Sequence, residues 1–138
     1  MKKKDVLLLL LITVIIPNCS SSKEEADIRL HDIWAIESIE SYAVLIDESI
    51  KNLPVLEIYV AEKRVHGNTG CNTINGEVNI DGNNITFQNI VTTEMACPGN
   101  LEQRFLTNLI KVNRYKIEKL RLHLFEDDKE LMVFKKID

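Results

Sequence analysis

The sequence predicts a mainly β (α+β) fold, in which an antiparallel sheet curls or closes around one packed helix. Short runs of β-branched and aromatic residues recur along most of the chain, and turn-forming residues separate them. One segment, residues 98–113, places its apolar residues at helical spacing. The length of 138 residues is enough for a single domain with a core of its own.

The first 18 residues have the form of a signal peptide. Residues 2–4 are lysines, and an apolar run over residues 6–16 follows. This run is shorter than the ~20 apolar residues that cross a bilayer, and it suits the hydrophobic region of a signal peptide. The arrangement before Cys19 resembles a bacterial lipoprotein signal, although Pro17 and Asn18 replace the small residues usual there. We expect cleavage after residue 18 and a lipid on Cys19; an ordinary cleaved signal peptide is the alternative.

Residues 19–27 are short, polar and acidic, and we expect them to form a flexible tether. Several buried acyl chains on Cys19 would hold the following domain, residues 28–138, stably at a membrane. The expected location is the cell envelope, as an outer-membrane-anchored lipoprotein on its periplasmic or surface-exposed face. The acidic residues behind Cys19 also resemble the export tag of some surface-displayed lipoproteins; a solvated linker is the alternative.

Strands dominate the first part of the domain. Trp34 and Ile36 alternate as in a half-buried strand, and Trp34 is expected in the core. Residues 55–60 are rich in β-branched and aromatic side chains, and residues 64–66 form the return strand after a turn. Residues 77–81 and 85–87 form a hairpin, because the Asp-Gly-Asn-Asn sequence between them tolerates positive φ angles. Residues 90–93 continue as strand or extended chain.

The helix predicted over residues 98–113 begins with Asn100 as a cap, and Gln103 completes a loose capping box. Its apolar residues recur at i, i+4, i+8 and i+11, and this stripe is expected to pack on the sheet: Leu101, Phe105, Leu109 and Val112. Three more strands follow, over residues 114–118, 120–125 and 130–135, and the last two are joined by a turn at Asp127 and Asp128. The total is about eight strands and one helix.

Two short motifs flank the predicted hairpin, Gly-Asn-Thr-Gly-Cys-Asn from residue 67 and Thr-Thr-Glu-Met-Ala-Cys-Pro from residue 92. The two glycines of the first motif favour a tight bend or a bulge. Both motifs, in this order and followed by a helix, resemble the META domain of the HslJ-like family. The positions that carry the resemblance are Gly67, Gly70, Cys71, Asn72, Thr93, Met95, Ala96 and Cys97.

This resemblance covers approximately residues 28–135 and implies an incomplete lipocalin-like barrel with one helix, often carried by envelope lipoproteins. It transfers no catalytic residue. Glu94 departs from the basic or apolar residue expected at its position, which affects any charge-dependent role there and leaves the fold prediction unchanged. The links of the family to stress response describe circumstances and not a mechanism.

Cys71 and Cys97 are the two cysteines of the domain once Cys19 is assigned to lipid. In an oxidising envelope such a pair favours a structural disulfide, and closing a loop of about 26 residues would stabilise the fold by roughly 3–4 kcal/mol. Two free buried thiols are one alternative. A redox-active or metal-binding pair is another; it lacks the Cys-x-x-Cys spacing of redox pairs, and a zinc site would need two more ligands.

No enzymatic constellation is apparent in the sequence. The three histidines share no motif, no serine lies in a nucleophile-elbow pattern, and no glycine-rich phosphate loop precedes a helix. Glu102 is explained by its favourable interaction with the helix N-terminus. The acidic pair Asp127 and Asp128 lies in a turn and lacks the spacing of a calcium loop. We therefore expect no catalytic residue, no metal site and no cofactor.

The net charge of −4 argues against nucleic acid as a partner, because nucleic-acid binders present a basic face. The expected function is that of a non-enzymatic envelope lipoprotein, structural or stress-protective through protein contacts. The alternative is a module that binds a small apolar ligand or lipid, since curled antiparallel sheets hold such ligands between their faces or at their mouth.

Overall fold

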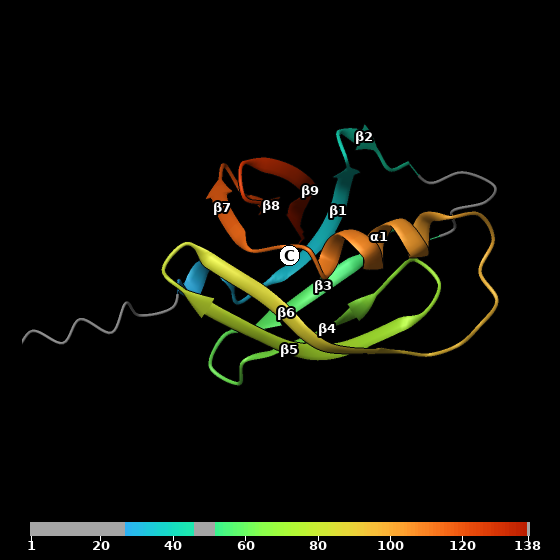
Figure 1. The fold of residues 1–138 in the computed structure, drawn as a ribbon, viewed down its shortest axis with the longest axis horizontal. Coiled ribbons are helices and arrows are strands. Elements are labelled where there is room, and N and C mark those ends of the chain that lie inside the picture. The colour runs from blue at the N-terminus through green and yellow to red at the C-terminus, as the bar shows by residue number, and fades with distance from the viewer. Residues whose placement is uncertain (1–26, 46–51, 138) are drawn as a thin grey trace, which may run out of the picture.

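The structure is a computed structural model that describes residues 27–45 and 52–137. One antiparallel sheet contains all of its strands in the order β2-β1-β3-β4-β5-β6-β7-β8-β9, and β1 also pairs with β9 (Figure 1). The elements are η1 (Ile28–Leu30), β1 (Ile33–Ile39), β2 (Tyr42–Ala43), β3 (Val55–Tyr59), β4 (Arg64–Asn68), β5 (Thr73–Asp81), β6 (Asn84–Thr92), α1 (Leu101–Leu109), β7 (Arg114–Glu118), β8 (Arg121–Glu126) and β9 (Lys129–Ile137).

The sheet curls until its first and last long strands meet. Six residue pairs join β1 to β9, with a bulge between Ile36 and Ser38. The opposite seam, between β6 and β7, is much thinner, because its only paired residues are Asn84 and Arg114. A mainly β fold with a curled antiparallel sheet and one helix is therefore confirmed.

The helix and the largest side chains occupy the inside of the curl. In the view of Figure 1, α1 lies between the β3–β6 part of the sheet and the part formed by β1 and β9. Phe105 of α1 packs edge-to-face on Phe134 of β9, with 6.2 Å between ring centroids. Trp34 is 1% exposed, and its ring nitrogen donates a hydrogen bond to the carbonyl of Leu30 over 3.1 Å. Trp34 is thus a core residue, as predicted.

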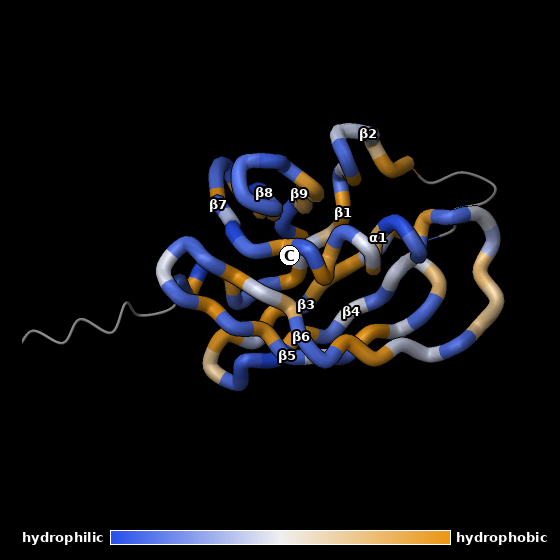
Figure 2. The backbone as a smooth tube through the Cα atoms, viewed as in Figure 1, coloured by the Kyte–Doolittle hydropathy of each residue, from blue (hydrophilic) through white to orange (hydrophobic). Residues whose placement is uncertain are grey.

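Polar and apolar residues alternate along the strands, so each strand presents one face to this core. Figure 2 shows hydrophobic and hydrophilic segments alternating along the tube of the sheet. In β8, for example, Leu122 and Leu124 are completely buried, whereas His123 between them is only partly buried. The side-chain period of two predicted for one-face burial is therefore present.

The helix is shorter than predicted, and it is not capped as predicted. It spans Leu101–Leu109 instead of residues 98–113, since Gly99 has a φ of 70° before it and tight turns follow it. Asn100 makes no side-chain capping bond, so the predicted capping box is wrong. The apolar stripe is still correct, because Val112 remains 2% exposed although it lies beyond the last helical turn.

Four strands are longer than predicted, namely β4, β5, β6 and β9, and the structure contains nine strands in its described part. β5 begins at Thr73 rather than at residue 77, and β6 joins the two separate predicted segments 85–87 and 90–93 into one strand. The register shifts between Asn75 and Glu77 of β5, opposite Asn89, whose φ is 51°. This bulge allows one strand to continue where local patterns indicated a break.

Gly67 and Gly70 serve different purposes, and only one of them bends the chain. Gly70 has a φ of 90°, which favours glycine, as expected for a tight turn. Gly67 lies in extended β4, where an added Cβ would come within 2.0 Å of the Val55 carbonyl oxygen of β3. The bend expected at Gly67 is therefore wrong, and close approach of two strands explains the glycine instead.

The predictions for the leader and the tether, including lipid on Cys19, fall on residues 1–26 and lie outside the described residues. Within the described ranges, none of the helices has the length and apolar character needed to cross a membrane.

Candidate functional site

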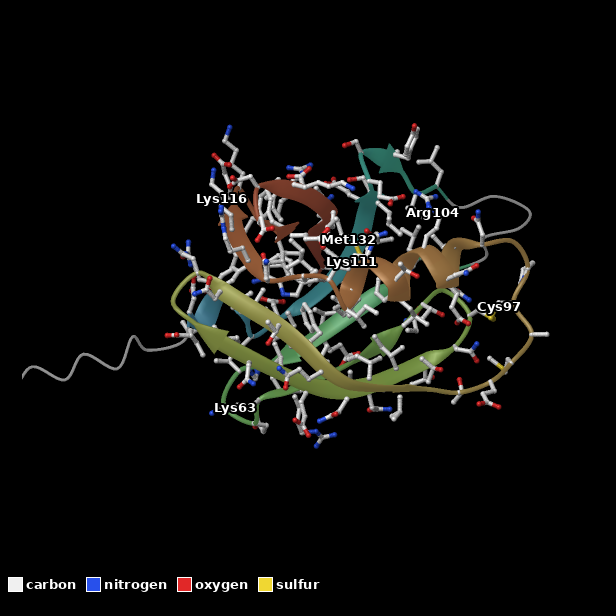
Figure 3. All side chains as sticks on the ribbon, viewed as in Figure 1. Lys63, Cys97, Arg104, Lys111, Lys116 and Met132 are labelled. Atoms are coloured by element: carbon white, nitrogen blue, oxygen red, sulfur yellow. A yellow bond between two sulfur atoms is a disulfide. The ribbon has the colours of Figure 1, made fainter. Side chains whose placement is uncertain are left out.

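The two motifs meet at one end of the sheet. The first motif forms the turn between β4 and β5, and the second forms the long connection from β6 to α1. The predicted disulfide is present between Cys71 and Cys97, whose Cα atoms are 5.9 Å apart. Figure 3 shows Cys97 on this long connection, at the edge of the molecule. The disulfide thus ties the connection to the turn.

Asn72 is the centre of a hydrogen-bond network that holds the connection beside the disulfide. Its side chain is buried, with 1% of the residue exposed. Its amide oxygen accepts bonds from the Met95 backbone N–H and the Thr93 hydroxyl, both over 2.8 Å. Its amide nitrogen donates to the Met95 carbonyl over 3.0 Å and to Cys97 Sγ over 3.1 Å. The Asn72 side chain therefore both accepts a hydrogen bond from the Met95 backbone N–H and donates one to the Met95 carbonyl, as a residue of a neighbouring strand would.

Glu102 joins the same network from the first turn of α1. One carboxylate oxygen accepts a bond from the Asn72 side-chain amide over 3.0 Å, and the other accepts a bond from the Thr69 hydroxyl. Thr69 is 1% exposed and also accepts a bond from the Asn72 backbone N–H over 2.9 Å. The favourable interaction of Glu102 with the helix N-terminus therefore explains only part of its role, because this carboxylate also connects the helix to both motifs.

The sequence pattern indicated no role for Thr69 and only a helix-end role for Glu102. The two residues are separated by 33 positions, and neither belongs to a local pattern that indicates contact. The available signal was the polar character of Thr69 within the first motif, because a buried hydroxyl requires a partner.

The motif residues divide into buried anchors and exposed side chains. Gly67 and Asn72 are buried, whereas Thr93, Met95 and Ala96 are exposed. Met95 is 59% exposed although its backbone is held on both sides by Asn72. The network therefore presents a large apolar side chain to solvent on a backbone of defined conformation.

An apolar hollow of about 480 Å³ begins at the disulfide and extends over the outer face of the neighbouring strands. Ile33 of β1 pairs with Ile137 of β9, and Ala35 of β1 pairs with Val55 of β3, which places these side chains side by side. The residues that line the hollow are Ala35, Asn52, Leu53, Val55, Asn68, Gly70, Cys71 and Ile137. Because Cys71 lines the hollow and is bonded to Cys97, the disulfide links the hollow to the connection that carries Met95.

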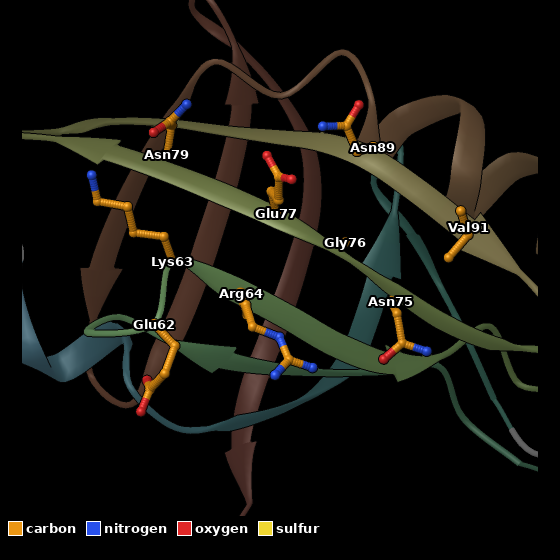
Figure 4. Close-up of a pocket in the computed structure, with 9 residues that line it drawn as sticks. All are labelled: Glu62, Lys63, Arg64, Asn75, Gly76, Glu77, Asn79, Asn89 and Val91. Atoms are coloured by element: carbon orange, nitrogen blue, oxygen red, sulfur yellow. The ribbon is translucent and has the colours of Figure 1, made fainter.

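A second hollow of about 480 Å³ lies on the outer face of β4, β5 and β6 (Figure 4). It adjoins the bulge at Gly76, where an added Cβ would come within 2.4 Å of the Ile90 side chain. Its residues carry charges of both signs and three amides, and they include no serine, histidine or cysteine: Glu62, Lys63, Arg64, Asn75, Gly76, Glu77, Asn79, Asn89 and Val91.

The histidines lie on separate elements and have separate partners. His31 accepts a bond from the Val60 backbone N–H, His66 contacts Asn75 and His123 contacts Glu130. His31 is exposed and the other two are partly buried, so the three histidines do not come together in one group.

Comparison with known proteins identifies the family. The family model of the META domain matches residues 27–138. A search of the curated proteins finds no match.

Solved structures with a similar fold include an NMR structure that is 21% identical, with 78% of this chain and 90% of that chain covered and a TM-score of 0.60. An NMR structure of a protein from Burkholderia xenovorans is 17% identical, with 78% and 82% covered and a TM-score of 0.60. A crystal structure of a DUF4847 family protein from Bacteroides vulgatus is 16% identical, with 80% and 97% covered and a TM-score of 0.57. At these identities the likeness concerns the fold alone. Since the family model matches nearly the whole described structure, the chain belongs to the META domain family.

Proposed function

We propose that this protein is a non-enzymatic interaction module of the cell envelope, anchored through lipid on Cys19, that contacts a partner protein through the connection around Met95. The observation that carries the proposal is the combination of an exposed Met95 side chain, at 59%, with a backbone held by the buried amide of Asn72.

A held connection favours binding because little conformational entropy remains to be lost when a partner docks. Methionine suits such a surface, since its unbranched, polarizable side chain adapts to differently shaped partners. Binding residues also concentrate on loops that a rigid scaffold positions. The disulfide and the Asn72 network supply that scaffold here.

The apolar hollow beyond the disulfide extends the same surface. Leu53, Val55 and Ile137 line it, and Ile137 is 38% exposed. Apolar side chains gathered beside a protruding connection form the kind of surface that protein partners cover.

The interior supports the protein-contact role over the alternative of an internal apolar ligand. Trp34, Phe105 and Phe134 are each at most 1% exposed and belong to one continuous buried cluster. Side chains thus occupy the space between the walls of the curl, where a lipocalin-like module would hold a ligand.

The anchoring half is tested by labelling cells with radioactive palmitate. We expect label on the wild-type chain and none on a Cys19→Ser variant. An unlabelled wild type would overturn the anchoring half and leave the contact half to be judged separately.

The contact half is tested by placing a photo-crosslinking amino acid at position 95 in living cells. We expect a discrete cross-linked product of defined mass, and its yield should fall when Asn72→Ala releases the connection. The matched control position is Leu120, which is 66% exposed on the turn between β7 and β8. Equal cross-linking at both positions, or none at position 95, would overturn the proposal.

A further inference from the structure

The disulfide and Glu102 form a compact group of metal-ligating atoms. The sulfur atoms of Cys71 and Cys97 and a carboxylate oxygen of Glu102 all lie within 4.8 Å of one another. All three residues are partly buried, so the group is reachable from solvent and still sheltered. We propose that reduction of the Cys71–Cys97 disulfide converts this group into a site for one divalent zinc ion.

The ligand chemistry determines which metal is suitable. Thiolate sulfur together with carboxylate oxygen is a donor set that zinc accepts in tetrahedral geometry. Two thiolates and one carboxylate fill three positions and leave the fourth to a water molecule. Such an open fourth position distinguishes this site from a closed structural zinc site with four protein ligands.

The site is held together independently of the disulfide. The Asn72 side chain bonds to the Met95 backbone, and the Thr93 backbone N–H donates to the Thr73 carbonyl over 3.1 Å. The Thr73 backbone N–H in turn donates to the Thr93 hydroxyl over 3.1 Å. These contacts lie immediately beside both cysteines, so the two thiols stay adjacent after the sulfur–sulfur bond is broken.

Glu102 is oriented for the role by its own partners. Thr69 donates to one carboxylate oxygen and Asn72 donates to the other. Hydrogen bonds of this kind fix the direction of a ligating carboxylate and are a regular part of metal sites. Asn72 also donates to Cys97 Sγ over 3.1 Å, which would support a thiolate in the same way.

The conversion balances with a dithiol as reductant. The disulfide takes up two electrons and two protons and becomes two thiols, while the dithiol loses the same number and closes its own disulfide. Zinc then displaces the two thiol protons as it binds, because the thiolate is the ligating form. Either closed form, the disulfide or the zinc site, joins the Met95 connection to the β4–β5 turn.

The proposal is tested with full-length protein in mild detergent, reduced anaerobically and titrated with cobalt(II) as a visible substitute for zinc. We expect thiolate-to-cobalt charge-transfer absorption that saturates at one ion per chain and is abolished by zinc. The oxidised protein and a Cys71→Ser, Cys97→Ser variant should show none. Far-UV circular dichroism should show that the reduced chain is folded before metal is added; a chain that unfolds on reduction would overturn the proposal.

A pair of isosteric variants tests the contribution of Glu102. Hydrogen-bond partners of metal ligands are worth about 10- to 100-fold in affinity, so Glu102→Gln, which removes a direct ligand, should weaken zinc binding at least as much. Glu94→Gln removes the same charge from an exposed position in the same connection and should leave the affinity unchanged. Equal affinities in the wild type and Glu102→Gln, or equal losses in both variants, would contradict a site built on Glu102.

Discussion

The motif end of the sheet and the seam between β6 and β7 differ in what holds them. At the motif end, a disulfide and a buried polar network join the β4–β5 turn to the connection before α1. At the seam between β6 and β7, a single residue pair remains, and the core inside the curl, where Phe105 of α1 packs on Phe134 of β9, is apolar. The motif end is thus held by a covalent bond and polar contacts, whereas the β6–β7 side of the sheet depends on apolar burial.

The difference follows from what each place must accomplish. The connection from β6 to α1 is irregular, so directional hydrogen bonds are needed to define its path. Inside the curl, the apolar face of α1 packs against the sheet, as Phe105 does on Phe134 of β9, which requires volume rather than direction. Hydrogen bonds at the motif end therefore define the path of a surface connection, whereas apolar burial inside the curl stabilises the fold.

The largest expected effect is in the apolar core inside the curl. Phe105→Ala should lower the free energy of unfolding by about 3–5 kcal/mol, because it removes a completely buried ring and leaves a cavity. Urea unfolding measures the change. Ile110→Ala, at the end of the same helix and 65% exposed, should stay within about 0.5 kcal/mol. Similar losses in both variants would contradict the cavity explanation, because truncating the exposed Ile110 side chain leaves no cavity in the core.

The second effect is at the motif end. Cys71→Ala with Cys97→Ala should lower the free energy of unfolding by about 3–4 kcal/mol, since the disulfide closes a loop over a separation of 26 residues. The variant should keep native protection of the β8 and β9 amides in hydrogen exchange. Loss of that protection would mean that the motif end and the β8–β9 part of the sheet unfold as one cooperative unit. The two regions would then not be held independently.

The third effect separates the polar network from the covalent bond. Asn72→Ala should cost roughly 1–3 kcal/mol, because the partly buried Met95 backbone groups and Glu102 lose their partner. The Met95 amide should exchange with solvent faster, while the disulfide remains intact by mass. Asn75→Ala, an exposed asparagine in β5, provides the control and should leave this exchange unchanged.

The smallest effect involves the ion pair of Glu37 and Arg121, which spans β9 on the outer face with N–O distances of 2.6 and 2.9 Å. The hydrogen bond from Arg121 lowers the pKa of Glu37 from its ordinary value of 4.5. The stabilisation is thus complete above the unfolded pKa and is lost as the pH falls through the lower folded pKa. Glu37→Gln should weaken the protein slightly at pH 7 and progressively less below about pH 4.5, as urea midpoints would record. A difference that grows towards acid pH would refute this assignment.

Much of the fold could be predicted because its signals are local. The alternation of Leu122 and Leu124 with His123 indicates a strand, and the spacing of Phe105 and Leu109 indicates a helix, whatever lies elsewhere in the chain. Helix ends were less predictable, since Asn100 is of a residue type favoured at N-caps, yet its side chain makes no capping hydrogen bond. The disulfide could be predicted from the number of cysteines and the expected compartment.

The sequence by itself determined the strand and helix periods and the turn residues, and it favoured the pairing of two cysteines. Only the tertiary structure decided that Thr69 and Asn72 meet Glu102, that Gly67 permits strand contact, and that Met95 is held yet exposed. The physical reason is distance along the chain: side-chain period and turn propensity are set by neighbouring residues, whereas a buried polar group acquires its partner only when the sheet has curled and brought remote segments together.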